Sequence, residues 1–237
     1  MRARHPPFLP AQCRPTEDAT LVGMHLFIDV DGTLLNSFPG IASTIESTFT
    51  ELGLPMPSAA QLSRVPGPPL IDTFRAWQLP HPEEALAVYR RRYLAEGWAQ
   101  AELFPGWAEA LPRWRAEGLG LCTATSKGDA VTAQMLERVG VAQYFDFIGG
   151  ADDAGGTRPT KRHVIEWVLD SMDLRGRENE ILMIGDRSHD YEGARPLCIR
   201  TALVGWGHGT DEECAAADFF CADFAELDAL VHSLRDG

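Results

Sequence analysis

The chain of 237 residues is long enough for one large domain, or for a core with a smaller inserted module. Its 45% hydrophobic and 23% charged residues are typical of a soluble globular protein, and no apolar run reaches the length of a membrane span. A formal net charge of −13 argues against nucleic acid as a partner, because phosphate backbones are bound by clustered lysine and arginine.

Residues 1–23 are rich in proline, arginine and polar side chains and show no hydrophobic period. They lack the apolar stretch of a secretory signal, and Glu17 and Asp18 fit a transit peptide poorly. We therefore expect a disordered extension ahead of Met24. The five cysteines are odd in number and form no CxxC pair, which favours a reducing compartment, so we expect a cytoplasmic protein.

From Leu26 onward, apolar runs typical of buried strands alternate with helical patterns. The predicted strands are 26–30, 118–125, 145–150, 181–186 and 201–207. The helical patterns between them include 127–139, 160–172 and 188–195. This alternation predicts an α/β fold in which helices cover both faces of a mostly parallel sheet. In such sheets the ligand lies at the carboxyl ends of the strands.

Residues 39–105 interrupt the alternation. They contain no convincing strand, only helical patterns at 39–53, 58–63, 69–78 and 82–98. We expect an all-helical module inserted between the first two strands of the core. The core itself would then comprise residues 24–38 and 106–237.

Polar side chains follow the predicted strands at the carboxyl edge. The first strand ends in Asp29 and Asp31, and the fourth is followed by Asp186 and Asp190. Two further loops supply hydroxyl and ammonium groups, from Thr125, Ser126, Lys127 and Lys161. Each residue alone has an ordinary explanation, such as a helix cap or a solvated surface charge.

The two lysines change that assessment. The chain has 19 arginines and only these two lysines, and both lysines fall in loops at predicted strand ends. A compact ammonium group suits a small anionic site in a way that the planar arginine fork does not.

The chemistry that fits this set is phosphoryl transfer to an aspartate, because a carboxylate can attack phosphorus and form an aspartyl-phosphate. Two carboxylates about 4 Å apart would repel by roughly 4 kcal/mol at an effective dielectric of about 20, so a counter-charge is required. Mg²⁺ would supply it, held by the side chains of Asp29 and Asp186 and by the backbone carbonyl of Asp31. Lys161 would neutralise the nucleophile and the phosphate.

The remaining groups have roles in the same reaction. Thr125 and the backbone N–H of Ser126 would bind phosphate oxygens, with Thr33 and Lys127 as further candidate phosphate contacts. Asp31 would protonate the leaving alcohol and then activate water, a role worth roughly 10²–10⁴ in rate. From the helical module, the loop 64–69 could bring Arg64 to the phosphate.

Together, "DVDGTLLNS", "TATSK", Lys161 and "IGDRSHDYEGA" resemble, in the right order, the four motifs of the haloacid dehalogenase superfamily. The resemblance covers residues 24–230 and implies a Rossmann-like core with Asp29 as nucleophile and Asp31 as acid–base. It also implies a metal site that Asp190 completes beside Asp29, Asp31 and Asp186. The inserted helices resemble the cap of the phosphoglycolate phosphatase-like and 5′-nucleotidase-like branch.

These observations predict a Mg²⁺-dependent phosphatase that acts on a small phosphorylated metabolite, either phosphoglycolate-like or a nucleoside monophosphate, as a monomer or homodimer. A sugar phosphomutase is the sister alternative, weakened because the cap contains no lysine. A catalytically silent binding protein on this fold is the third, and the presence of every motif residue argues against it. A dehalogenase would have no use for the metal or for Asp31.

Overall fold

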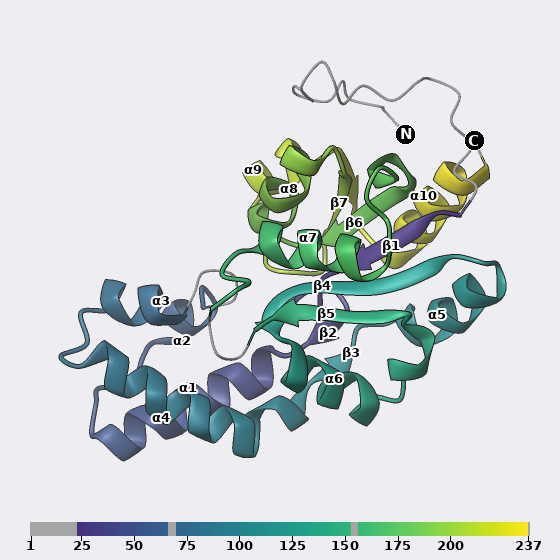
Figure 1. The fold of residues 1–237 in the computed structure, drawn as a ribbon. Helices are drawn as coiled ribbons and strands as arrows, with labels where there is room; N and C mark the ends of the chain where they lie inside the picture. Colours follow the sequence, from purple (N-terminus) through teal and green to yellow (C-terminus); the bar gives the residue numbers. More distant parts are fainter. Residues whose placement is uncertain (1–22, 66–69, 153–155, 237) are drawn as a thin grey trace. The chain divides into compact units, whose positions relative to one another are not determined.

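A six-stranded parallel sheet forms the centre of the larger part of the chain. The computed structural model describes residues 23–65, 70–152 and 156–236, so all but the last residue of the predicted extension 1–23 lies outside the described residues. The strand order is β5-β4-β1-β6-β7-β8, and each neighbouring pair is parallel (Figure 1). The predicted α/β fold is thereby confirmed.

The elements of this core follow the predicted alternation. Its strands are β1 His25–Ile28, β4 Gly120–Gly128, β5 Phe147–Ala151, β6 Ile181–Gly185, β7 Arg200–Val204 and β8 Phe219–Cys221. Its α-helices are α5 Trp107–Ala116, α6 Asp129–Arg138, α7 Lys161–Ser171, α8 Ser188–Ala194, α9 Asp211–Ala216 and α10 Phe224–Asp236. Most predicted strand boundaries lie within about two residues of those observed, but two strand ends are further off: β4 continues to Gly128, where a helix was expected from 127, and β7 ends at Val204 instead of 207.

Strand β1 lies in the middle of the sheet and is covered on both faces. Residues 26–28 are fully buried, which explains why this strand reads as a continuous apolar run. On one face, Phe27 packs in a core cluster with Val164 and Val168 of α7. Elsewhere in the core unit, α5 contacts α10, where Trp114 Nε1 donates a hydrogen bond to the Asp228 carboxylate at 2.9 Å.

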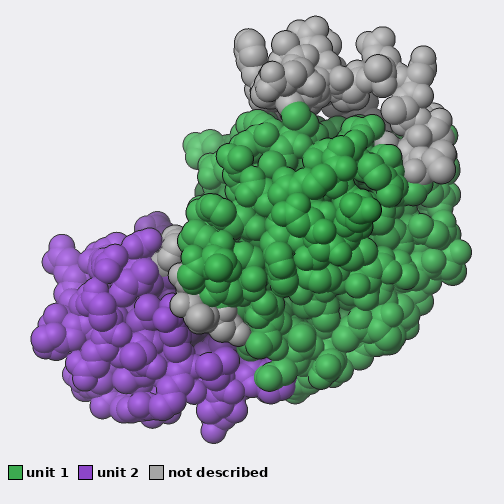
Figure 2. Space-filling model, in the orientation of Figure 1, with its two compact units in different colours: residues 1–34, 103–237 green, residues 35–102 purple. Residues whose placement is uncertain are grey.

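The described residues within 35–102 form a second compact unit, and those within 1–34 and 103–237 form the first (Figure 2). The second unit contains the α-helices α1 Phe38–Leu52, α2 Ala59–Leu62, α3 Leu70–Ala76 and α4 Pro82–Ala95, so the inserted module is helical as predicted. One detail is wrong: the short strand β3, Glu102–Leu103, pairs with β2, Leu35–Asn36, where no strand was expected.

The helical unit has its own small core. The ring of Phe49 in α1 packs edge-on against Phe74 and Trp77, with both pairs of ring centroids 5.9 Å apart. The Glu51 carboxylate joins α1 to α4 through ion pairs with Arg91 and Arg92. None of the helices in the described ranges combines the length and apolar character needed to cross a lipid bilayer.

Candidate active site

The turn that follows β1 is held rigidly at the carboxyl edge of the sheet. The backbone N–H of Asp29 donates to the carbonyl of Ile184 on β6 at 2.8 Å. Gly32 has φ of +79°, and a Cβ there would lie 2.2 Å from Asp186 Oδ2, so the turn needs glycine for both conformation and space. The Thr33 carbonyl accepts two indole N–H groups, at 3.1 and 2.9 Å, from Trp107 and Trp206.

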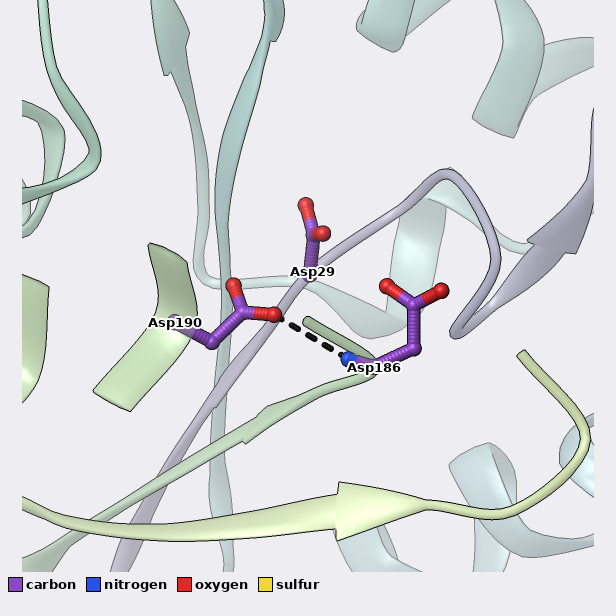
Figure 3. Close-up of side chains that lie close together, drawn as sticks. All are labelled: Asp29, Asp186 and Asp190. Carbon is purple, nitrogen blue, oxygen red and sulfur yellow. Dashed lines mark hydrogen bonds between the residues drawn. The ribbon is translucent and has the colours of Figure 1, made fainter. Parts of the chain in front are cut away.

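Three carboxylates converge at this edge. Asp29 follows β1, Asp186 follows β6 and Asp190 lies in the first turn of α8 (Figure 3). Each offers one oxygen, and these oxygens all lie within 4.8 Å of one another. Asp29 is 9% exposed, and Asp186 and Asp190 are each 1% exposed.

Burial and mutual repulsion disfavour negative charge in this cluster. Burial, reinforced by the charges of Asp190 and Asp29, raises the pKa of Asp186 well above its usual range. Burial also raises the pKa of Asp29 to about 6, although the Lys161 ammonium works in the opposite direction. A cation bound here would favour the ionised forms of both Asp186 and Asp29.

Lys161 is the positive partner of the cluster. Its Nζ lies 2.8 Å from Oδ1 of Asp29 and 2.8 Å from Oδ1 of Asp190, and it donates to the Ala124 carbonyl at 3.0 Å. Burial opposes the charge of Lys161, but the neighbouring carboxylates of Asp190 and Asp29 outweigh it and raise the lysine pKa.

Asp190 also organises the backbone. Its Oδ2 accepts the backbone N–H groups of Asp186 at 3.0 Å and Arg187 at 3.1 Å, which caps the start of α8. Because its Oδ1 contacts Lys161, both oxygens of this side chain are already engaged within the protein. Asp190 thus links β6, α8 and α7.

Asp31 meets the second lysine. Lys127 Nζ lies 3.0 Å from Asp31 Oδ2. The pairing of β4 with β5 shifts register between Thr125 and Gly128, and within this irregular stretch the Lys127 backbone N–H donates to Thr125 Oγ1 at 3.3 Å. Thr125 is buried, and its hydroxyl favours the ionised form of Asp29, whereas Ser126 is exposed at the strand end.

A segment that the sequence reasoning missed completes the site. After β7 the chain returns over Asp186, whose Oδ2 accepts the backbone N–H of His208 at 2.8 Å. A Cβ at Gly207 would lie 2.3 Å from Asp186 Cβ, so the backbone approaches the carboxylate closely. The recurring glycines of "GWGHG" at a strand end were the available signal, but the sequence interpretation treated residues 205–207 as strand.

The structure therefore brings most of the predicted site residues together in the core unit: Asp29, Asp31, Thr33, Thr125, Ser126, Lys127, Lys161, Asp186 and Asp190. Arg64 belongs to the helical unit, where it is exposed just after α2, and its part in phosphate binding stays a prediction. Most of the loop that carries it lies outside the described residues.

The donor set fits Mg²⁺. Hard divalent cations prefer carboxylate and carbonyl oxygens, and three buried carboxylates offer oxygens within 4.8 Å of one another here, with Lys161 in contact with two of them. The buried oxygens Asp31 Oδ1 and Thr33 Oγ1 have no hydrogen-bond partner among the described residues. The site is therefore rich in oxygen donors and short of positive charge.

Residues 26–204 match the haloacid dehalogenase-like hydrolase family. The chain belongs to this family. The match contains the strand-end carboxylates and both lysines, and it confirms the predicted superfamily.

Known relatives differ in their assigned activities. The chain is 38% identical over 196 residues to the tyrosine-protein kinase PtkA of Mycobacterium tuberculosis. This match covers 82% of this chain but only 65% of that protein. It is 32% identical over 227 residues to a 5′-nucleotidase of Pseudomonas aeruginosa, and this match covers 91% of this chain and 99% of that protein. Among solved structures, the haloacid dehalogenase-like family protein SP0104 from Streptococcus pneumoniae superimposes with a TM-score of 0.80 at 29% identity, over 89% of this chain and 98% of that one.

Proposed function

We propose that this protein is a Mg²⁺-dependent phosphatase that hydrolyses a small phosphomonoester, phosphoglycolate-like or a nucleoside monophosphate, through an aspartyl-phosphate on Asp29. The observation that carries the proposal is the placement of Lys161, which lies 2.8 Å from both Asp29 and Asp190 at the edge where Asp186 also lies. A nucleophilic carboxylate needs such a cation to approach an anionic phosphate.

Asp29 and Asp186, with the Asp31 carbonyl, would hold Mg²⁺, and Asp190 would orient Lys161 and the start of α8. The bound ion would supply positive charge to the phosphate oxygens. Thr125 and the backbone N–H of Ser126 would bind those oxygens from the end of β4.

In the first step a carboxylate oxygen of Asp29 attacks phosphorus, the bond from phosphorus to the alcohol oxygen breaks, and Asp31 gives that oxygen its proton. In the second step Asp31 takes a proton from water as the water oxygen attacks phosphorus. The bond between phosphorus and Asp29 then breaks, which releases inorganic phosphate and restores both carboxyl groups.

The likeness to PtkA supports a second candidate, in which a protein tyrosine hydroxyl, and not water, accepts the phosphoryl group. The same Asp29 chemistry would serve both reactions, so the acceptor distinguishes them. Transfer of labelled phosphoryl from ATP to a tyrosine peptide, with little release of inorganic phosphate, would favour this candidate.

Phosphate release from phosphoglycolate, nucleoside monophosphates and sugar phosphates tests the leading proposal, with Mg²⁺ and with EDTA. Asp29→Asn is the decisive variant, and Asp170→Asn is the matched control, because the Asp170 side chain is 61% exposed on α7. We expect release that requires Mg²⁺, falls by at least about 10³-fold in Asp29→Asn and changes less than about twofold in the control. Release by Asp29→Asn at the wild-type rate would refute the nucleophile assignment.

A further inference from the structure

Each of the two lysines pairs with one of the two aspartates in the turn after β1. Lys161 pairs with Asp29, and Lys127 pairs with Asp31 through Nζ and Oδ2 at 3.0 Å. The Lys127 side chain is 9% exposed and that of Asp31 29% exposed, so this pair is shielded from water on the lysine side. Such a pair is held more firmly than a surface ion pair.

The backbone of β4 is shaped to place this lysine. The register of β4 against β5 shifts between Thr125 and Gly128, and the Lys127 N–H bonds to Thr125 Oγ1 within that stretch. On the acid side, Asp31 Oδ1 is buried without a hydrogen-bond partner among the described residues. Among the described residues, the Asp31 carboxyl group is therefore held through Oδ2, by its contact with Lys127.

We propose that Lys127 is a positioning residue for Asp31, in place of its predicted role as a phosphate contact. The proposal rests on the proposed phosphatase function, in which Asp31 moves the proton. Displacing a reacting group by about 1 Å can cost about 10² in rate, so an acid that has lost its orienting partner should transfer its proton poorly.

The two roles of Lys127 differ in how they depend on the leaving group. When Asp29 attacks an alkyl phosphate, the departing alkoxide needs the proton of Asp31. p-Nitrophenolate is stable enough to depart without that proton. A phosphate contact would act on the transferred group, which is the same in both substrates, whereas a positioning residue for Asp31 would act only where the proton matters.

The test measures formation of the phosphoenzyme in a single turnover, as radioactive phosphate retained on acid-quenched protein. The substrates are p-nitrophenyl phosphate and the best alkyl phosphate of the panel, with wild type, Lys127→Met and Lys127→Arg. We expect Lys127→Met to slow the alkyl reaction about 10–100-fold and the aryl reaction less than about threefold. Lys127→Arg, which can still donate to Oδ2, should recover part of the alkyl rate. Equal slowing of both substrates would overturn the proposal in favour of a phosphate contact.

A double-mutant cycle gives the sharper criterion. If Lys127 acts through Asp31, Lys127→Met should add no further slowing of the alkyl reaction in an Asp31→Asn background. If the slowing factors of the two single variants instead multiply in the double variant, the proposal is overturned. Thermal melting verifies folding, and Lys127→Gln replaces Lys127→Met if the methionine variant does not fold. A wild type that forms no phosphoenzyme from either substrate would instead refute the proposed function itself.

Discussion

Asp186 and Asp190 are equally buried, yet the protein uses them in opposite ways. Asp190 accepts two backbone N–H groups and contacts the Lys161 ammonium, so its charge is compensated within the fold. Asp186 accepts a hydrogen bond from His208 but otherwise lies close to like charges. The charge of Asp190 is therefore balanced by the fold, whereas that of Asp186 is disfavoured by burial and by its acidic neighbours.

Replacing each of these residues should consequently have opposite effects on stability. We expect Asp190→Ala to lower the free energy of unfolding by about 3 kcal/mol, because it removes a partner from the backbone N–H groups of Asp186 and Arg187 and from the buried ammonium of Lys161. Asp186→Asn, the matched control, should leave the free energy of unfolding unchanged or raise it by about 1 kcal/mol, because it removes a buried, repelled charge.

Urea unfolding in EDTA measures both effects. Adding Mg²⁺ should then stabilise the wild type but not Asp186→Asn, because only a state that binds the ion gains stability from it. Two variants with equal losses in EDTA would contradict this division of roles.

At the scale of elements, the segment after β7 controls the position of Asp186. Its Trp206 indole donates to the Thr33 carbonyl, and the His208 N–H donates to Asp186 Oδ2. A single short segment therefore contacts both the turn after β1 and the carboxylate after β6. Glycine at 207 allows this approach, because a side chain there would meet Asp186.

Gly207→Ala should disturb that arrangement. The new Cβ would lie 2.3 Å from Asp186 Cβ and 2.7 Å from the Gly32 carbonyl oxygen, so the backbone must shift. We expect a loss of about 1–3 kcal/mol in unfolding free energy and of about 10² in kcat. Gly156→Ala is the control, because among the described residues a Cβ there would come no closer than 3.7 Å, to Asp152 Oδ2. Wild-type kcat in Gly207→Ala would show that Asp186 does not depend on the close approach.

The sequence reasoning located the elements whose pattern is local. The buried runs that end in Asp29 and Asp186 have the length and composition of parallel strands, so their type and approximate ends could be read directly. The end of β4 could not, because the strand continues through Lys127 only by shifting its register against β5. Strand β8, with three residues, is too short to show a period.

The site shows the same limit. The identities of the acids and lysines could be inferred because their chemistry is unusual for their positions. The sequence could not show which lysine pairs with which acid, because Lys127 and Asp31 are brought together by the pairing of distant strands. The double indole contact at Thr33 was hidden for the same reason, since Trp107 and Trp206 look like ordinary packing residues.

For the whole molecule, the formal net charge of −13 opposes the approach of the proposed substrate, a phosphomonoester dianion. Salt screens this long-range repulsion, with a Debye length of about 8 Å at physiological ionic strength, while the buried lysine contacts are screened much less. We expect kcat/KM to rise about twofold between about 20 and 150 mM salt, with kcat unchanged. The measurement keeps pH constant and free Mg²⁺ saturating. A steep fall of kcat/KM with salt would show that a positive local field governs association instead.

Strand β1 lies at the centre of the sheet, with β4 on one side and β6 on the other. On the ribosome, this strand emerges long before either neighbour, and His25 must wait for Gly120 and Ile181 to complete its pairing. Pairings between such distant residues form slowly, and domains generally fold as units. A growing chain thus carries Asp29, the proposed nucleophile, early but cannot assemble the acidic cluster around it until the strand before Asp186 has been made. Under the proposed mechanism, the order of strands in the sheet would therefore keep an incompletely synthesised chain inactive.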